Sequence, residues 1–394
     1  MELDSKYIFN GEFGLERETL RVNGNGGMAQ TDHPFESSSM ERDFCENQLE
    51  IITPVCNGAE ALMRALTALD SEAKEMLRGR NEFLWMYSNP PRIASDNDII
   101  IAKYSGDRAS KHEYRKKLAE KYGKRLMLYS GIHLNLSFPE EWLEKNSHGG
   151  DYKDFKNRLY FRLFRQAVRH SWLLVLLTAA SPVYDGSFDD YALSGSAFDG
   201  YASKRNGNKG YKNRFSPILD YTDIEAYVRS VESYIKDGSL LAASELYVPV
   251  RVKPRGENSL DALREKGINH IELRMFDLNP LSPVGIFTED IEFAYYLMLY
   301  LISLDDFVFT PELQLEAERK HEAAARYYVD APLLDEAIQI LDAMTEYFKS
   351  FPRVINNIVL QKAKLTENNR YCVRVYEKYK DDYQKQMLSD MKQI

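Results

Sequence analysis

Residues 126–138 read LMLYSGIHLNLSF, and apolar and polar side chains alternate along this stretch. Ile132, Leu134 and Leu136 share one face, whereas His133 and Asn135 share the other. Successive side chains on a strand point to opposite faces of the sheet, so the pattern predicts a strand with one apolar and one polar face. Such strands are typical of antiparallel sheets that pack against helices on one side only.

Two further stretches, ELYVPVRVK at 245–253 and HIELRMF at 270–276, alternate in the same way. Their polar faces carry Glu245, Tyr247, Arg251 and Lys253 on the first, and His270, Glu272 and Arg274 on the second. Pro249 lacks an N–H group, which predicts an edge strand or a bulge. A polar face rich in His, Arg, Tyr and Glu is as consistent with a lined functional cavity as with plain exposure to solvent.

Apolar residues at helical spacing predict helices over 59–78, 111–121, 153–178, 288–303, 311–328 and 333–350. A further helix is expected to begin at Thr222, with Glu225 completing a capping box. Helices and alternating strands together predict an α+β fold, in which an antiparallel sheet is covered by helices on one side.

The composition narrows the class of protein. The 394 residues include 51 Lys and Arg against 60 Asp and Glu, a net charge of −9 that argues against a broad electrostatic grip on nucleic acid. The longest uncharged apolar runs, 171–184 and 293–304, are shorter than the roughly 20 residues that span a bilayer. Three dispersed cysteines and no evident signal peptide favour the cytoplasm. We therefore expect a soluble cytoplasmic protein without nucleic-acid or membrane partners.

Paired carboxylates in FGLERETLRV, residues 13–22, indicate a metal site. On a strand, Glu16 and Glu18 project to the same face, where they repel each other unless a cation compensates them. The alternative is a surface strand whose glutamates pair with Arg17 or Arg21, but those arginines point to the opposite face. A bound divalent ion is the better interpretation.

A second acidic set occurs in DFCENQLEIITP, residues 43–54. Read as a helix at about 100° per residue, this segment places Asp43 and Glu50 on one side and Glu46 about 60° away. A solvated acidic face is the alternative. Oxygen and imidazole ligands without a thiolate favour Mg²⁺ or Mn²⁺ over zinc.

The loop SKRNGNKGY at 203–211 is polar and contains glycine, which suits either a mobile lid or a plain surface loop. Neither a GxxxxGK[ST] nor a GxGxxG motif occurs, so a P-loop or Rossmann nucleotide site is unsupported.

The motifs together resemble a known family. FGLERETLRV, DFCENQLEIITP, YSGIHLNLSF, ELYVPVR and HIELRMFDLNPLSPVGI follow the order seen in bacterial glutamate–cysteine ligases, both the stand-alone enzyme and the ligase half of the bifunctional glutathione-forming protein. The resemblance covers residues 13–286 and implies a fold related to glutamine synthetase, with a curved antiparallel sheet forming a funnel. We expect one catalytic domain over 1–330 and a helical C-terminal extension over 331–394 packed on it.

The resemblance also implies roles for individual residues. The implied metal ligands are Glu16, Glu18, Asp43, Glu50, His133 and Glu272. Glu272 and Arg274 would be catalytic, with Arg274 meeting the ATP phosphates. The implied substrate-binding residues are Arg115 for glutamate, and Arg205, Tyr211 and Tyr247 for cysteine.

The implied activity is ATP-dependent ligation of the L-glutamate γ-carboxylate to the amine of L-cysteine through γ-glutamyl phosphate, the first step of glutathione synthesis. Its partners would be ATP, L-glutamate and L-cysteine, with Mg²⁺ (or Mn²⁺), in a monomer or homodimer. This chain departs from the family in Trp85-Met86-Tyr87-Ser88-Asn89-Pro90, where Trp-Pro-x-Ser-Met-Pro is usual, and in the Lys- and Asn-rich loop. A same-fold ligase that uses another amine or amino acid is therefore the alternative. A sensor that binds nucleotide and metal is a third reading, which the complete ligand set argues against.

Overall fold

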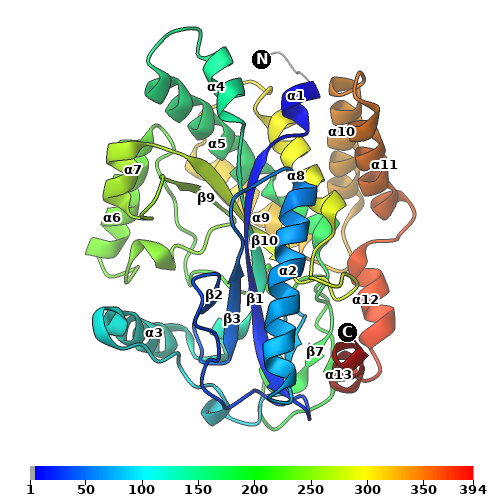
Figure 1. The fold of residues 1–394 in the computed structure, drawn as a ribbon. Helices are drawn as coiled ribbons and strands as arrows, with labels where there is room; N and C mark the ends of the chain where they lie inside the picture. Colours follow the sequence, from blue (N-terminus) through cyan, green and yellow to red (C-terminus); the bar gives the residue numbers. More distant parts are fainter. Residues whose placement is uncertain (1–4, 394) are drawn as a thin grey trace.

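A computed structural model describes residues 5–393 and has the expected α+β architecture (Figure 1). The strands are β1 (Glu12–Asn23), β2 (Met40–Arg42), β3 (Gln48–Ile52), β4 (Cys56–Asn57), β5 (Glu82–Trp85), β6 (Gly131–Ser137), β7 (Tyr184–Asp185), β8 (Ser196–Ala197), β9 (Val250–Lys253) and β10 (His270–Asp277). The helices are α1 (Ser5–Ile8), α2 (Ala59–Arg78), α3 (Ala109–Tyr122), α4 (Glu140–Asn146), α5 (Tyr152–Thr178), α6 (Ile224–Lys236), α7 (Leu260–Lys266), α8 (Thr288–Leu301), α9 (Pro311–Ala324), α10 (Ala331–Tyr347), α11 (Pro352–Thr366), α12 (Tyr371–Tyr379) and α13 (Tyr383–Gln393).

The main sheet is antiparallel, in the order β2-β3-β1-β6-β10-β9, with β4 and β5 pairing the two ends of β1. The strand that follows Pro249 therefore lies at an edge, as its missing N–H predicted. Long-range pairing brings β1, β6 and β10 side by side although they are far apart in the sequence. The strands that carry Glu16, His133 and Glu272 thus lie next to one another in the middle of the sheet.

The apolar face of the sheet packs against α2, α5 and α8, and Figure 1 shows α2 lying along β1. Leu134 and Leu136 of β6 are buried there, together with Ile271 and Leu273 of β10. Complete burial of such side chains contributes about 1.5–3 kcal/mol each, so this face holds the sheet to its helices.

Two arginines of β1 also enter the apolar side. Arg17 Nη2 lies 2.7 Å from Asp70 of α2, and Arg21 Nη1 lies 2.5 Å from Glu82 of β5. Both guanidinium groups are buried. They point away from Glu16 and Glu18, which confirms the prediction that the arginines and glutamates of β1 occupy opposite faces.

The helix predicted for residues 43–54 is wrong, because residues 48–52 form β3. The seven-residue spacing of Asp43 and Glu50 suited a helix, but Leu49 and Ile51 alternate with Gln48 and Glu50 and pair with β1. Pairing with a neighbouring strand, which lies far away in the sequence, outweighs local helical spacing.

Smaller boundaries also differ. The strands expected from residues 126 and 245 begin later, at Gly131 and Val250, after 3₁₀ turns at Arg125–Leu128 and Ala243–Glu245. Helix α6 starts at Ile224, where the Asp223 side chain accepts a hydrogen bond from Ala226 N, so the predicted Thr222–Glu225 capping box is wrong. None of the helices within residues 5–393 is long and apolar enough to cross a lipid bilayer.

The helices after residue 330 pack on the rest of the chain. Lys364 of α11 lies 2.7 Å from the buried carboxylate of Asp290 in α8, and Tyr371 donates a hydrogen bond to the same carboxylate. Helix α13 packs against β5 and β7. The division into a catalytic domain over 1–330 and an extension over 331–394 stays a prediction.

Candidate active site

The polar face of the sheet gathers carboxylates and one histidine from four strands. In the register of the sheet, Glu16 lies opposite His133, and Glu18 lies opposite Glu50. Glu272 of β10 lies opposite Asn135 of β6 and projects to the same face. Ligand atoms within 4.8 Å of one another form two groups, Glu16–His133–Glu272 and Glu18–Glu50–His133, which share the imidazole.

The group at Glu18 and Glu50 is only partly compensated, because Arg205 and Arg274 oppose the pKa shifts less than burial and neighbouring carboxylates raise them. Burial raises the pKa of Glu18 to about 8, and the nearby carboxylate of Asp43 adds to the shift. Burial, followed by Asp43 and Glu16, also holds the pKa of Glu50 well above its ordinary value. These carboxylates disfavour their own ionisation unless a cation joins them, as expected for a divalent metal site.

His133 has a neutral imidazole, since burial and the neighbouring Arg274 lower its pKa to about 4. Nδ1 lies 3.2 Å from the Glu16 carboxylate, so a proton on Nδ1 satisfies Glu16 and leaves the lone pair on Nε2. Buried Nε2 has no hydrogen-bond partner within residues 5–393 and lies 3.8 Å from Glu18 Oε1. A free imidazole nitrogen beside two partly compensated carboxylates fits a hard divalent cation.

The group at Glu272 is different, because cations already flank it. Arg274 Nη1 lies 3.1 Å from Glu272 Oε2, and Lys253 Nζ lies 3.2 Å from Oε1. Burial opposes ionisation, but Arg274 and Lys253 hold the pKa of Glu272 well below its ordinary value. Lys253 was given no role from the sequence, although its place on the polar face of a strand is visible in the alternation.

Asp43 lies beside the cluster rather than within either of the two groups. It precedes β3, and its carboxylate lies 3.4 Å from Arg115 Nη2, while Arg115 Nε also donates to the Asp43 carbonyl. The structure therefore brings Arg115, the expected glutamate-binding residue, to the Glu18–Glu50 side of the site.

The loop over 203–211 is neither a mobile lid nor a plain surface loop, because it is anchored inside the protein. Ser203 Oγ donates to the buried carboxylate of Asp277, and Arg205 Nη2 donates to the Arg274 carbonyl at 2.8 Å. Arg205 is only 5% exposed, and a Cβ added at Gly131 would lie 2.4 Å from its Cζ. Gly131 therefore leaves the space that the guanidinium fills.

Arg205 also lacks an ion-pair partner, since no carboxylate of the part of the chain that the structure describes lies within 4.0 Å of it. A buried cation is costly unless it is paired. Gly131 lies against this arginine, and its backbone N–H donates to the Glu18 carboxylate at 3.0 Å. The unpaired guanidinium thus lies at the Glu18 end of the cluster and is suited to bind an anionic ligand.

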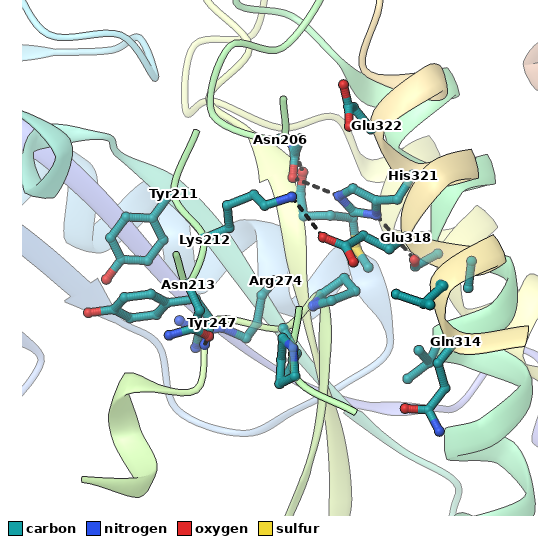
Figure 2. Close-up of a pocket in the computed structure, with 18 of the residues that line it drawn as sticks. Asn206, Tyr211, Lys212, Asn213, Tyr247, Arg274, Gln314, Glu318, His321 and Glu322 are labelled. Atoms are coloured by element: carbon teal, nitrogen blue, oxygen red, sulfur yellow. Dashed lines mark hydrogen bonds and ion pairs between the residues drawn. The ribbon is translucent and has the colours of Figure 1, made fainter. Parts of the chain in front are cut away.

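Tyr211 and Tyr247 lie next to Arg205, and the centroids of the two tyrosine rings are 4.4 Å apart. Behind them lies a cavity of about 140 Å³. Figure 2 shows the two tyrosine rings on one side of this cavity, and His321 and Glu318 of α9 on the other. His321 hydrogen bonds with Asn206 and Ser171 and so fixes the back of the loop.

The structure shows where both departures from the family pattern lie. Trp85 packs edge-on against Tyr383 of α13 and donates to the Asn89 carbonyl, so residues 85–90 lie under the C-terminal helices. Within the loop, Lys204 pairs with Asp199 at 2.6 Å, and Lys209 is exposed. Arg205 and Tyr211 are thus the loop side chains that the structure places next to the cluster.

Comparison with known proteins identifies the family. The family model for glutamate–cysteine ligase matches residues 2–240 and 216–323. The chain belongs to the glutamate–cysteine ligase family. The bifunctional glutathione biosynthesis protein of Listeria monocytogenes is 35% identical over 374 residues, which cover 88% of this chain and 48% of that protein. The corresponding protein of Clostridium perfringens is 33% identical over 384 residues, covering 87% and 49%.

Solved structures agree with this family. The crystal structure of a bifunctional glutathione synthetase from Pasteurella multocida matches with a TM-score of 0.86 and 26% identity, covering 98% of this chain and 52% of that one. The glutamate–cysteine ligase of Francisella tularensis shares the fold, with a TM-score of 0.83, 24% identity and coverage of 98% and 88%. The chain spans about half the length of the curated relatives that it matches.

For a member of this family, the arrangement is chemically specific. One polar sheet face carries the partly compensated Glu18–Glu50 pair, the Glu272 carboxylate flanked by Arg274 and Lys253, and buried Arg205 with no ion pair within 4.0 Å among the described residues. Such a site can bring several anions together, which reactions that join a carboxylate to a phosphoryl group require.

Proposed function

We propose that this chain joins the γ-carboxylate of L-glutamate to the amine of L-cysteine at the expense of ATP. The observation that carries the proposal is the pair of metal-suited groups that share His133, with Arg274 at one end and the unpaired Arg205 at the other. In this reaction the γ-carboxylate attacks the γ-phosphate of ATP, and the cysteine amine then displaces phosphate from γ-glutamyl phosphate. Free Cys45, Cys56 and Cys372 suit the reducing cytoplasm that we propose as its location.

The cluster residues would hold Mg²⁺, with Mn²⁺ as a substitute. Glu16 and Glu272 would form one ligand group and Glu18 and Glu50 the other, with Asp43 beside them, and the neutral imidazole of His133 would complete one of the two. When bound, the ions neutralise the repulsion between the γ-carboxylate and the triphosphate. The carboxylates act as ligands and need not move protons.

The cationic side chains would orient the substrates. Arg274 lies on the same face as Glu272 and would stabilise the charge of the transferring phosphoryl group. Arg115, beside Asp43, would bind the carboxylate of glutamate. Holding both reactants in line removes much of the entropic cost of bringing them together.

The acceptor would be an amino acid rather than a plain amine. Arg205 is a buried cation that forms no ion pair within 4.0 Å among the described residues, although Glu18 and Asp277 act on its charge from farther away, so the α-carboxylate of the acceptor would be its closest partner. Tyr211 and Tyr247 would close around a small side chain. The lysines of the loop are paired elsewhere or exposed, which favours cysteine over the alternative of a different amine acceptor.

Release of ADP tests this function directly. We expect ADP to form only when glutamate, Mg²⁺ and an acceptor are present, and the product mass to equal that of γ-glutamylcysteine. L-2-aminobutyrate should be used less well, and putrescine scarcely at all. Faster turnover with putrescine than with cysteine would move the activity to the alternative ligase, whereas nucleotide binding without any turnover would indicate a sensor.

A further inference from the structure

Lys253 is a buried cation at the edge of the site that the proposed function leaves without a role. Its side chain is 12% exposed, and Nζ lies 3.2 Å from Glu272 Oε1. In the register of β9 and β10, Lys253 lies opposite His270, and Arg251 lies opposite Glu272. Since alternate residues share a face, Lys253 stands one repeat beyond Glu272, on the side away from Arg274.

The site therefore has a direction along the sheet. Gly131 contacts Arg205 and donates to Glu18, so the acceptor-binding cation lies at the Glu18 end. Glu272 lies opposite Asn135, which is farther along β6 from Gly131 than His133 is. The order along the face is Arg205, Glu18, His133, Glu272 and finally Lys253.

This order assigns an end to each substrate. In phosphoryl transfer the attacking and the leaving oxygen lie roughly in line on opposite sides of the phosphorus atom. The acceptor and the glutamate carboxylate occupy the Arg205 end under the proposed function. The leaving ADP then lies at the opposite end, where Lys253 is.

The charges at the Lys253 end of the site also favour an anionic ligand there. Glu16 and Glu272 carry two negative charges, whereas Arg251, Arg274 and Lys253 carry three positive charges, so this end already holds one more positive charge than negative. A divalent ion added between Glu16 and Glu272 increases this excess of positive charge. Only an anionic ligand offsets that excess. Neutralising Glu272 alone does not account for Lys253, because Arg274 already lies 3.1 Å from that carboxylate.

We propose that Lys253 is a phosphate-binding residue that holds the β-phosphate of ATP, with the triphosphate running along the sheet from Arg274 to Lys253. The nucleoside then lies at the β9 edge of the sheet. This assignment rests on the proposed function, and it adds to that function the direction in which ATP lies and the residue that holds its leaving group.

Calorimetric binding in Mg²⁺ tests the assignment without turnover, using ADP, AMP and the β,γ-imido analogue of ATP. A charge-assisted contact of about 1.5–3 kcal/mol predicts that Lys253→Met weakens ADP and the imido analogue roughly 10- to 150-fold. AMP, which lacks the β-phosphate, should change less than about twofold. Lys253→Arg should stay within a few-fold of wild type. Lys266→Met is the matched control, because Lys266 is an exposed lysine outside the site.

Unchanged affinity of Lys253→Met for ADP would overturn the assignment, and so would an equal loss for AMP and ADP, which indicates a structural role. If Lys253→Met does not fold, acetylation of Lys253 in the wild-type protein decides the matter by mass spectrometry. We expect ADP with Mg²⁺ to protect this lysine and AMP not to, and equal protection by both would overturn the proposal. A wild-type protein that bound none of the three nucleotides would overturn the proposed function itself.

Discussion

The two faces of β1 carry the same kinds of charge but treat them in opposite ways. On the helix-covered face, Arg17 and Arg21 are buried and each pairs with a carboxylate of this chain at 2.7 and 2.5 Å. On the other face, Glu18 and Glu50 keep raised pKa values despite the nearby arginines, and Arg205 is buried with no ion pair within 4.0 Å among the described residues. Charges that stabilise the fold are neutralised within the chain, whereas charges that serve the site are left for ligands.

The largest effect should come from the face of β1 that carries Glu16 and Glu18, which we call the open face. Glu50→Gln and Glu272→Gln each remove a charged ligand, and losing about 4 kcal/mol of charge stabilisation slows ADP formation roughly 10³-fold. Steady-state ADP release at saturating Mg²⁺ measures this. Near-wild-type turnover of either variant would remove that residue from the metal site.

The same two variants should also distinguish the group at Glu50 from the group at Glu272 by their effects on stability. Without Mg²⁺, and at a pH high enough to ionise Glu50, Glu50→Gln removes a repelling charge and should raise the melting temperature, because burial and Asp43 disfavour the ionised carboxylate. Glu272→Gln instead leaves Arg274 and Lys253 unpaired and should lower it. Calorimetric melting in EDTA distinguishes the two. Shifts in the same direction would contradict the distinction between the two groups.

The next effect concerns the helix-covered face of β1, where Arg17 and Arg21 are paired with carboxylates. Asp70 forms ion pairs with both Arg17 and Lys74, each at 2.7 Å, so Asp70→Asn leaves the buried Arg17 without its charge partner. Breaking a buried ion pair costs about 3–5 kcal/mol of unfolding free energy. Urea unfolding should show this loss, while the KM values for substrates stay within about twofold, because Asp70 lies on the far face from the site. Replacing both partners, as Arg17→Met with Asp70→Asn, should recover part of the stability.

The sequence predicted the centre of this fold because the information there is local. Alternation placed Glu16 and Glu18 on one face of β1, and His133 and Glu272 on the polar faces of β6 and β10, whereas their place in one site was implied by the family resemblance. The segment around Glu50 was misread as a helix, because its alternation covers only five residues and is decided by β1.

The loop at 203–211 shows where local reading ends. Its burial depends on Asp277, which lies 74 residues away from Ser203 and accepts its hydroxyl. Its composition of Ser, Lys, Asn and Gly is that of an exposed loop, so nothing within the segment indicated an internal anchor. The unpaired state of Arg205 is likewise a property of its neighbours in space, not of its own sequence.

A smaller effect concerns that unpaired arginine. Losing a guanidinium–carboxylate contact of about 1.5–3 kcal/mol predicts that Arg205→Ala raises the acceptor KM roughly 10- to 150-fold. The KM values for glutamate and ATP should move far less. Lys209→Ala, an exposed cation on the same loop, is the matched control and should change none of them. Gly131→Ala should also raise the acceptor KM, because its Cβ occupies the space of the intact guanidinium. Equal cysteine KM values in Arg205→Ala and wild type would contradict the acceptor role.

The smallest effect is a proton count on the open face. In the metal-free protein the pKa of Glu18 is raised to about 8, chiefly by burial, so at pH 7 this carboxyl is mostly protonated. Metal binding needs the ionised form, so adding Mg²⁺ at pH 7 should release close to one proton from Glu18, and fewer as the pH rises above 8.

The same raised pKa makes the stability of the metal-free protein depend on pH. Since the folded pKa lies above the unfolded one, the folded state binds the extra proton, and the metal-free protein loses stability as the pH rises from about 4.5 to 8. Melting temperatures in EDTA should fall over that window, and they should fall less in Glu18→Gln, which cannot ionise. Calorimetric Mg²⁺ titrations in buffers of different ionisation enthalpy count the released protons. Equal proton release in Glu18→Gln and wild type would show that Glu18 is already compensated, and that the two faces of β1 do not differ in the way described.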